Sequence, residues 1–177
     1  RIDSTVRARL GDAVTGVGIG DGNADDDESD LRVSVAAADD AEAFSLALGM
    51  GLAAGGGKKD VSAGGAASIA VNRISTQVEA GVLGLGLAGD RDGPAQVEDL
   101  AVTAESDASG QAYSVAVGAA VKFGVAGAVS VNDLHGSTAA RIGARSHVSA
   151  DDDVAVVARS EEDVISGTGT LGVGLKK

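Results

Sequence analysis

Large apolar residues alternate with small ones over long stretches of this chain. From Phe44 to Leu52 every second position is Phe, Leu or Met, and the positions between them are Ser, Ala or Gly. The same alternation runs from Tyr113 to Val131. A period of two indicates β-strands, because successive side chains point to opposite faces. The pattern predicts sheets that bury the large apolar face, while the small face lets another sheet or backbone approach closely.

The run 112–131 is long and apolar, so a helix, even one of the roughly 20 residues that span a membrane, is the alternative. The run contains Lys122 and keeps its alternation, and its valines favour strands. A segment that crosses a membrane through strands would alternate too, but it needs aromatic residues at both borders of its apolar zone. Phe44, Tyr113 and Phe123 are the only aromatics of the chain. We therefore expect strands and no membrane insertion.

An internal repeat organises the chain. Residues 30–49 align without gaps to 99–118, which places Phe44 on Tyr113, and a third copy starts at 153. A second block, 71–82, recurs at 131–142, and residues 1–10 match 73–82. Constant framework lengths with variable connections are typical of a stacked array. We expect a single repetitive domain, residues 1–177, that is part of a longer array, with copies starting near 30, 99 and 153.

The predicted fold class is all-β. A repetitive β-solenoid, or parallel β-helix, would stack like residues from one coil to the next. Asn72 and Asn132, each predicted to end a strand, would then hydrogen-bond to each other, although asparagine is also common in ordinary turns. An antiparallel stack of long β-hairpins, with the variable connections at the hairpin tips, is the alternative architecture.

Composition narrows the classes of function. The chain has 27 glycines and no cysteine, which excludes disulfides and zinc-thiolate sites. Its net charge of −12 argues against nucleic-acid binding, which needs clustered Lys and Arg, and against anionic membrane surfaces. Most of its apolar residues are Ala and Val, so a thin, elongated core is expected.

Acidic clusters precede each copy of the repeat, and their equivalent positions predict that they lie on one side of the structure. The cluster at 21–30 begins like a calcium loop, but Asp26 stands where an EF-hand needs Gly, and Arg32 where it needs Glu. Ca²⁺ is the only cofactor considered, with a solvated acidic rim as the alternative. The candidate ligands are Asp21, Asn23, Asp25, Asp27, Asp90, Asp92, Asp151 and Asp153.

We expect no enzymatic activity. Paired carboxylates in the groove of a β-helix would suggest a carbohydrate-active enzyme. Such enzymes also need aromatic platforms for sugar rings, and this chain has three aromatics in all. His135 and His147, its two histidines, do not have the spacing of metal ligands.

The repeat "DLAVTAESDASGQAYSVAVGAAVKFGVAGAVSVNDLHGSTAARI", residues 99–142, and its copies resemble the repeat regions of giant bacterial surface and secreted proteins. These are the filamentous-haemagglutinin-like and autotransporter-type adhesins. The resemblance covers nearly the whole chain. It implies a β-solenoid stalk at a cell surface or in an extracellular matrix, with no catalytic residues to transfer. Because the copies are longer than the coils of simple β-helices, each copy would make two or three coils.

The predicted function is therefore structural: a stiff β-rod, with acidic loops on one side, that forms part of an extracellular bacterial adhesin or filament. Its predicted partners are flanking repeats or other copies of the chain, joined through unpaired strand edges into a fibre. The sequence does not identify a host or matrix ligand. A calcium-dependent extension module is one alternative, and it predicts a melting temperature that rises with Ca²⁺ and falls with chelator. A β-helix carbohydrate-active enzyme is the other.

Overall fold

A computed structural model of the chain describes residues 1–11, 17–18, 32–53, 63–86 and 95–174. The all-β prediction is confirmed for these residues, which contain no helix and hence none able to cross a membrane. The strands are β1 (Ile2–Leu10), β2 (Val17–Gly18), β3 (Arg32–Ala53), β4 (Ala63–Val82), β5 (Leu85–Gly86), β6 (Ala95–Val97), β7 (Asp99–Ala120), β8 (Phe123–Ile142), β9 (Val148–Ala150) and β10 (Val154–Gly174).

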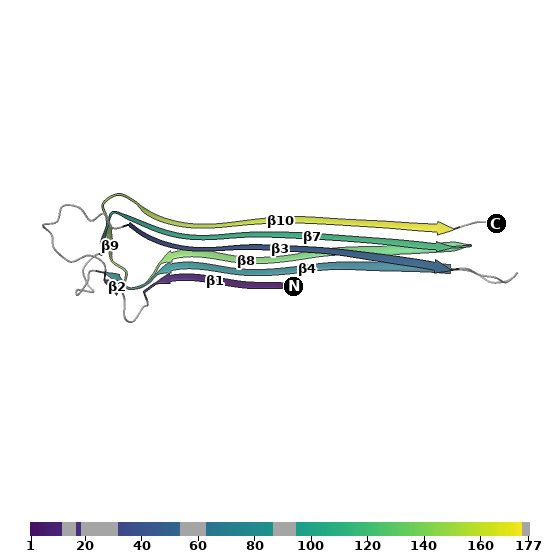
Figure 1. The fold of residues 1–177 in the computed structure, drawn as a ribbon, viewed down its shortest axis with the longest axis horizontal. Helices are drawn as coiled ribbons and strands as arrows, with labels where there is room; N and C mark the ends of the chain where they lie inside the picture. Colours follow the sequence, from purple (N-terminus) through teal and green to yellow (C-terminus); the bar gives the residue numbers. More distant parts are fainter. Residues whose placement is uncertain (12–16, 19–31, 54–62, 87–94, 175–177) are drawn as a thin grey trace.

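The long strands form two three-stranded sheets that pack face to face (Figure 1). One sheet has the order β1-β4-β8 and the other β10-β7-β3, and every strand pairing within them is parallel. The chain alternates between the sheets, so consecutive long strands lie in opposite sheets. The alternative of antiparallel hairpins is therefore wrong for the described strands, because hairpin partners would be hydrogen-bonded to each other.

The repeat copy 99–142 contributes one long strand to each sheet. β7 has 22 residues and β8 has 20, and only Val121 and Lys122 separate them. The expectation of two or three coils per copy is therefore wrong for 99–142. The alternation continues without a proline or a turn sequence to interrupt it, so one copy becomes one pass outward in one sheet and one pass back in the other.

The repeat alignments predict most of the strand register. Asn72 lies beside Asn132, Ile2 beside Ile74, and Leu100 beside Val154, as the alignments of β4 with β8, β1 with β4, and β7 with β10 require. The asparagines do hydrogen-bond to each other, but they lie inside β4 and β8 and do not end them. The prediction of strand ends at these two residues is wrong.

The alignment of 30–49 with 99–118 is two residues out of register. Leu46, and not Phe44, lies beside Tyr113, and the rings of Phe44 and Tyr113 contact diagonally with centroids 6.0 Å apart. The common end of β3 and β7 fixes the true register, with Ala53 beside Ala120. A shift by two residues keeps every side chain on its predicted face, because the period of a strand is two.

The two-sheet sandwich has two halves along the strand direction. The loop half comprises β1 and residues 32–43, 72–82, 99–112, 132–142 and 154–164. The tip half comprises 44–53, 63–71, 113–120, 123–131 and 165–174. In the loop half, apolar side chains fill the space between the sheets, including Val78, Val82, Leu100 and Val102, all at most 1% exposed. Its outer faces carry polar and charged residues, which is the usual distribution for a protein in water.

The tip half has the opposite distribution. Its large apolar side chains point outward, with Leu48 71%, Met50 86% and Leu52 85% exposed. Between the sheets lie small residues, of which Ser114 and Ala116 are completely buried. The prediction that the large apolar face is buried is therefore wrong in the tip half.

Close contact between the two backbones decides which face lies inside. A Cβ atom added to Gly51 would overlap the carbonyl oxygen of Gly65, and one added to Gly118 would overlap that of Val125. On β3, β4, β7 and β8 the inward-facing residues of the tip half are all Gly, Ala or Ser, and the edge strand β10 adds Thr168 and Thr170. The second part of the prediction, that the small face allows close approach, is confirmed.

We predict that Gly118→Ala destabilises the protein far more than Gly127→Ala. A Cβ at Gly118 meets backbone, which has little freedom to shift, whereas one at Gly127 has no atom within 4 Å. The first change should lower the free energy of unfolding by about 1–3 kcal/mol. The second should leave it unchanged or raise it by up to about 1 kcal/mol. Thermal melts followed by circular dichroism measure both, and equal shifts in melting temperature would contradict the close approach.

Candidate functional site

The described part of the chain contains two of the eight predicted calcium ligands. Asp151 and Asp153 are exposed between β9 and β10, and the backbone N–H of Asp153 donates to a side-chain oxygen of Asp99 at 3.3 Å. No group of three or more His, Cys, Asp or Glu side chains that could hold a metal occurs among the described residues. The other six predicted ligands, Asp21, Asn23, Asp25, Asp27, Asp90 and Asp92, lie outside the described residues, so calcium binding there stays a prediction.

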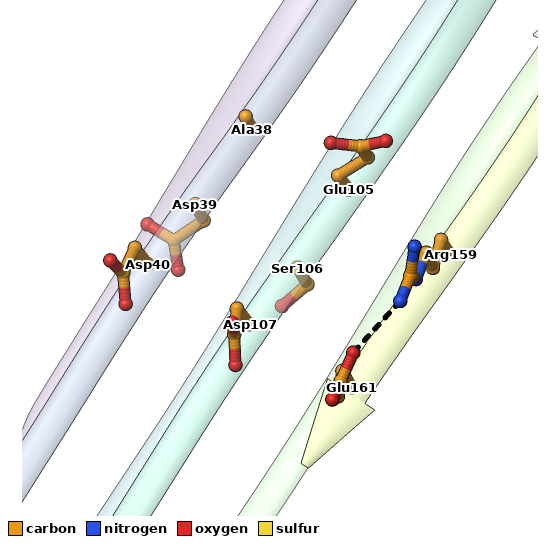
Figure 2. A pocket seen from close by; sticks show the side chains of 8 residues that line it. All are labelled: Ala38, Asp39, Asp40, Glu105, Ser106, Asp107, Arg159 and Glu161. Carbon is orange, nitrogen blue, oxygen red and sulfur yellow. Dashed lines mark hydrogen bonds and ion pairs between the residues drawn. The ribbon is translucent and has the colours of Figure 1, made fainter.

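A carboxylate ladder that the sequence analysis missed crosses the outer face of β3, β7 and β10. Asp40, Asp107 and Glu161 occupy equivalent positions on these neighbouring strands, which in a sheet lie about 4.8 Å apart (Figure 2). The alignment that is two residues out of register pairs Asp107 with Ala38 and so conceals the ladder. The third copy was correctly aligned and does place Glu161 beside Asp107.

A shallow depression lies over this ladder. Its lining also includes Ala38 and Glu105, and Arg159 is the one cation among its lining residues. The Arg159 guanidinium contacts the Glu161 carboxylate at 3.0 Å (Figure 2). Because these side chains are exposed and stand in a row without converging on one point, the arrangement is a strongly acidic surface and not an enclosed reaction site.

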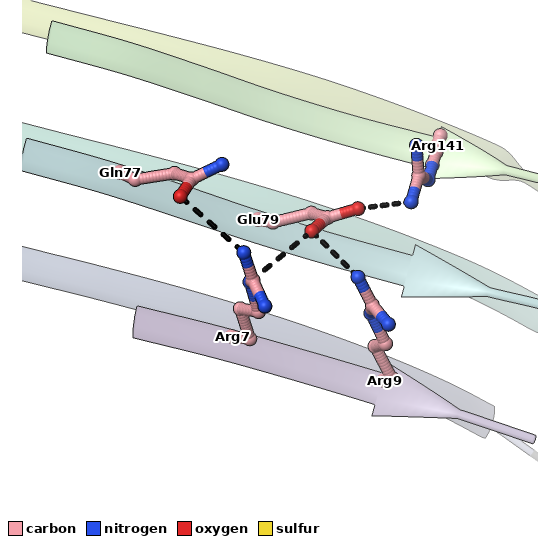
Figure 3. A network of polar contacts seen from close by, with 5 residues as sticks. All are labelled: Arg7, Arg9, Gln77, Glu79 and Arg141. Carbon is pink, nitrogen blue, oxygen red and sulfur yellow. Dashed lines mark hydrogen bonds and ion pairs between the residues drawn. The ribbon is translucent and has the colours of Figure 1, made fainter. Parts of the chain in front are cut away.

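The outer face of the other sheet carries an ion cluster centred on Glu79 (Figure 3). Arg7 and Arg9 reach it from β1, at 3.5 and 2.8 Å, and Arg141 contacts its second oxygen from β8. The side chain of Glu79 is only 11% exposed. Hydrogen bonding from Arg9, together with the charges of Arg141, Arg9 and Arg7, lowers the pKa of Glu79 and outweighs its partial burial, which acts in the opposite direction.

The cluster joins the three neighbouring strands β1, β4 and β8 of one sheet, because each of its arginines comes from a strand that flanks β4. It was also missed by the sequence analysis, which searched the acidic loops. The signal was present in the alignment of residues 1–10 with 73–82, which places Arg7 on Glu79. Charges of opposite sign at matched repeat positions would have identified it.

Polar side chains also cross the interior between the sheets. The Asn72 amide donates to the backbone oxygens of Gln111, at 2.6 Å, and Ala43, at 3.2 Å, and to the side-chain oxygen of Asn132, at 3.0 Å. The hydroxyls of Ser68 and Ser114 lie 2.6 Å apart. These bonds tie β4 to both β3 and β7, so the two sheets are held together by directional contacts as well as by apolar packing.

Comparison of the chain with protein-family models, with curated proteins and with solved structures gives no match.

We predict that Glu79 makes the stability of the protein depend on pH in the acid range. Because the pKa of Glu79 is lower in the folded state than its usual 4.5, its ion pairs contribute fully above pH 4.5. That contribution should disappear as the pH falls through the lowered folded-state pKa. Glu79→Gln should remove this part of the pH dependence and lower the melting temperature at pH 7, where the three arginines lose their counter-charge.

Glu42→Gln is the matched control, because Glu42 is exposed on the outer face of the opposite sheet. Melting temperatures measured between pH 7 and pH 3 compare the two variants with the wild type. A Glu79→Gln profile that runs parallel to the wild-type profile would show that the cluster has no such role.

Proposed function

We propose that this chain is a segment of a β-solenoid rod, part of an extracellular adhesin or filament at a bacterial cell surface, and that it has no enzymatic activity. In this rod each repeat copy is one coil, and the coils stack through backbone hydrogen bonds between equivalent strands. The resemblance of the repeats to those of giant bacterial surface proteins supports the location. The rod would connect or present other modules.

The main support for this proposal is that both sheets have open edges. β1 and β3 each end their sheet on one side, and β8 and β10 end the sheets on the other side. Within the described residues, each of these edge strands is paired along one side only. Exposed edge strands offer rows of N–H and C=O groups that pair readily with a further strand. A neighbouring coil, from a flanking repeat or another copy of the chain, would pair with the N–H and C=O groups of both sheets at once.

The acidic ladder supports a structural role. Asp40, Asp107 and Glu161 repel one another and also repel the same face of a neighbouring rod. Association along the stack, where strand edges meet, is thereby favoured over association through the charged outer face of the loop half. The chain's aromatics lie in the tip half, away from these carboxylates, which disfavours a sugar-binding groove at the ladder.

We predict that copies of the purified chain assemble side by side, with the open sheet edges of one copy paired to those of the next. Neighbouring residues in a strand direct their N–H groups to opposite sides, so one of Val157 and Ala158 donates toward β7 and the other toward the open edge of β10. Proline at the edge-directed position should stop assembly with a small change in melting temperature. Proline at its neighbour should lower the melting temperature, because it removes a hydrogen bond to β7.

Sedimentation velocity over a range of concentrations measures assembly, and electron microscopy shows whether the product is a filament. The wild type should form concentration-dependent oligomers that lengthen in one direction. A wild-type chain that remains monomeric, or two proline variants that behave alike, would contradict assembly through the edges.

A further inference from the structure

The tip half carries a continuous apolar band on both outer faces of the sandwich. The band consists of the outward-facing residues of 44–52, 63–71, 113–119, 123–131 and 165–173, and none of these positions is charged. It includes some of the most exposed apolar side chains of the described chain, on both sheets: Leu48, Met50, Leu52, Ile69, Phe123 and Val125. Large exposed apolar patches mark sites of interaction with another protein or with a membrane.

The small residues packed between the two sheets of the tip half suit a protein surrounded by lipid and not by water. In water, burial of large apolar side chains drives two sheets together, and here those side chains point away from the interface. In a lipid phase that driving force is lost, and association depends instead on close van der Waals contact between small residues. Gly51 and Gly118 provide such contact, and the paired hydroxyls of Ser68 and Ser114 add a hydrogen bond between the sheets.

The length of the band matches a bilayer. Phe44 to Leu52 covers eight residue steps of about 3.3 Å, or about 26 Å, close to the hydrocarbon thickness of about 30 Å. Charged outer-face residues begin directly beyond it, with Glu42 on β3, Arg73 on β4 and Asp133 on β8.

The three aromatics of the chain lie at the two borders of the band. Phe44 and Tyr113 contact each other where the outer face changes from polar to apolar, and Phe123 begins β8 beside the tip turn. Tyrosine is enriched at the interfaces of a membrane, and Tyr113 lies at such a border. Three aromatics are too few for two full belts, but all three lie at these two levels.

A single lysine at the tip complements lipid phosphate. Lys122 lies in the turn between β7 and β8. The loop half, by contrast, carries the acidic ladder.

We propose that the tip half inserts into the hydrocarbon of a phospholipid bilayer, with Lys122 at the far headgroups and the acidic loop half in water. A second copy packed against one face is a weaker explanation, because the opposite face is apolar at the same level and would stay exposed. Unpaired strand edges are strongly disfavoured in hydrocarbon. The inserted form is therefore a row of coils paired edge to edge, and in this respect the inference rests on the proposed function.

Site-specific fluorescence tests the insertion, since the chain has no cysteine of its own. The full chain is labelled with an environment-sensitive fluorophore at Met50→Cys in the band, or at Asp107→Cys in the loop half. On addition of phosphatidylcholine vesicles that contain phosphatidylglycerol, the probe at position 50 should shift to the blue and brighten several-fold. Nitroxide groups on the lipid chains should then quench it. The probe at position 107 should respond to neither.

Flotation of the chain with the same vesicles gives an independent readout. Leu48→Asp should abolish flotation, because it places a charge in the middle of the band. Ala36→Asp is its matched control on the outer face of the same strand, in the loop half, and should float like the wild type. If both variants float equally, the band is not the part that enters lipid and the proposal is overturned.

The outcomes separate this inference from the proposed function. A blue shift at position 50 without vesicles, and no quenching by lipid nitroxides, means that another copy of the chain covers the band, which overturns the inference and leaves the edges untouched. Loss of edge assembly in the proline variants with no loss of flotation supports insertion and contradicts the row of coils. Quenching at position 50 together with edge assembly supports both the insertion of the tip half and the proposed rod.

Discussion

Hydrogen bonding between successive copies of the repeat is the constraint on which this structure depends. Each long strand has its lateral partner in another copy, as when Ala41 of β3 lies beside Ala108 of β7. Equivalent positions must therefore accept each other as neighbours at the distance between adjacent strands, about 4.8 Å. The asparagine pair satisfies this condition by hydrogen bonding, and the alanines and glycines of the tip half satisfy it by leaving room for the opposite sheet.

The same constraint explains why the copies differ in their charged residues. Identical charges at equivalent positions would repel each other along the stack. Opposite charges occur instead where Arg7 lies beside Glu79, Arg32 beside Asp99, Arg73 beside Asp133, and Arg159 beside Glu105. What looks in the sequence like decay of the repeat is, at these four positions, a source of attraction between neighbouring copies. Among the paired positions of the described long strands, Asp40, Asp107 and Glu161 do combine like charges, and they lie where the outer face is open to solvent screening.

Much of the fold could be predicted from the sequence. Alternation identified the strands, and matched residues such as Asn72 and Asn132 identified which strands are neighbours. The register of β3 could not be chosen, because Phe44 can be aligned with Tyr113 or two residues away from it without changing its face. Which face is buried could not be predicted either. Alternation separates Leu48 from Gly49 but does not say which of them meets the opposite sheet, since that depends on how closely the two backbones approach.

The candidate sites were harder to predict than the fold for a related reason. The acidic loops were predicted as calcium sites because their carboxylates are close together in the sequence. The Glu79 cluster and the carboxylate ladder are assembled from residues that are far apart in the chain and meet only in the correct register. An error of two residues was enough to conceal the pairing of Asp40 with Asp107.

The positions of the connections make the two ends of the sandwich mechanically different. The segments that join one coil to the next, including 83–98 and 143–153, leave and enter the strands at the loop end, whereas the turn at Val121 and Lys122 stays within one coil. Tension along the stack is thus carried by covalent bonds at the loop end. At the tips only non-covalent contacts join neighbouring coils. If the sheets are pulled apart across their strands, neighbouring strands should separate first at the tips, and the loop-end connections should limit how far they move apart.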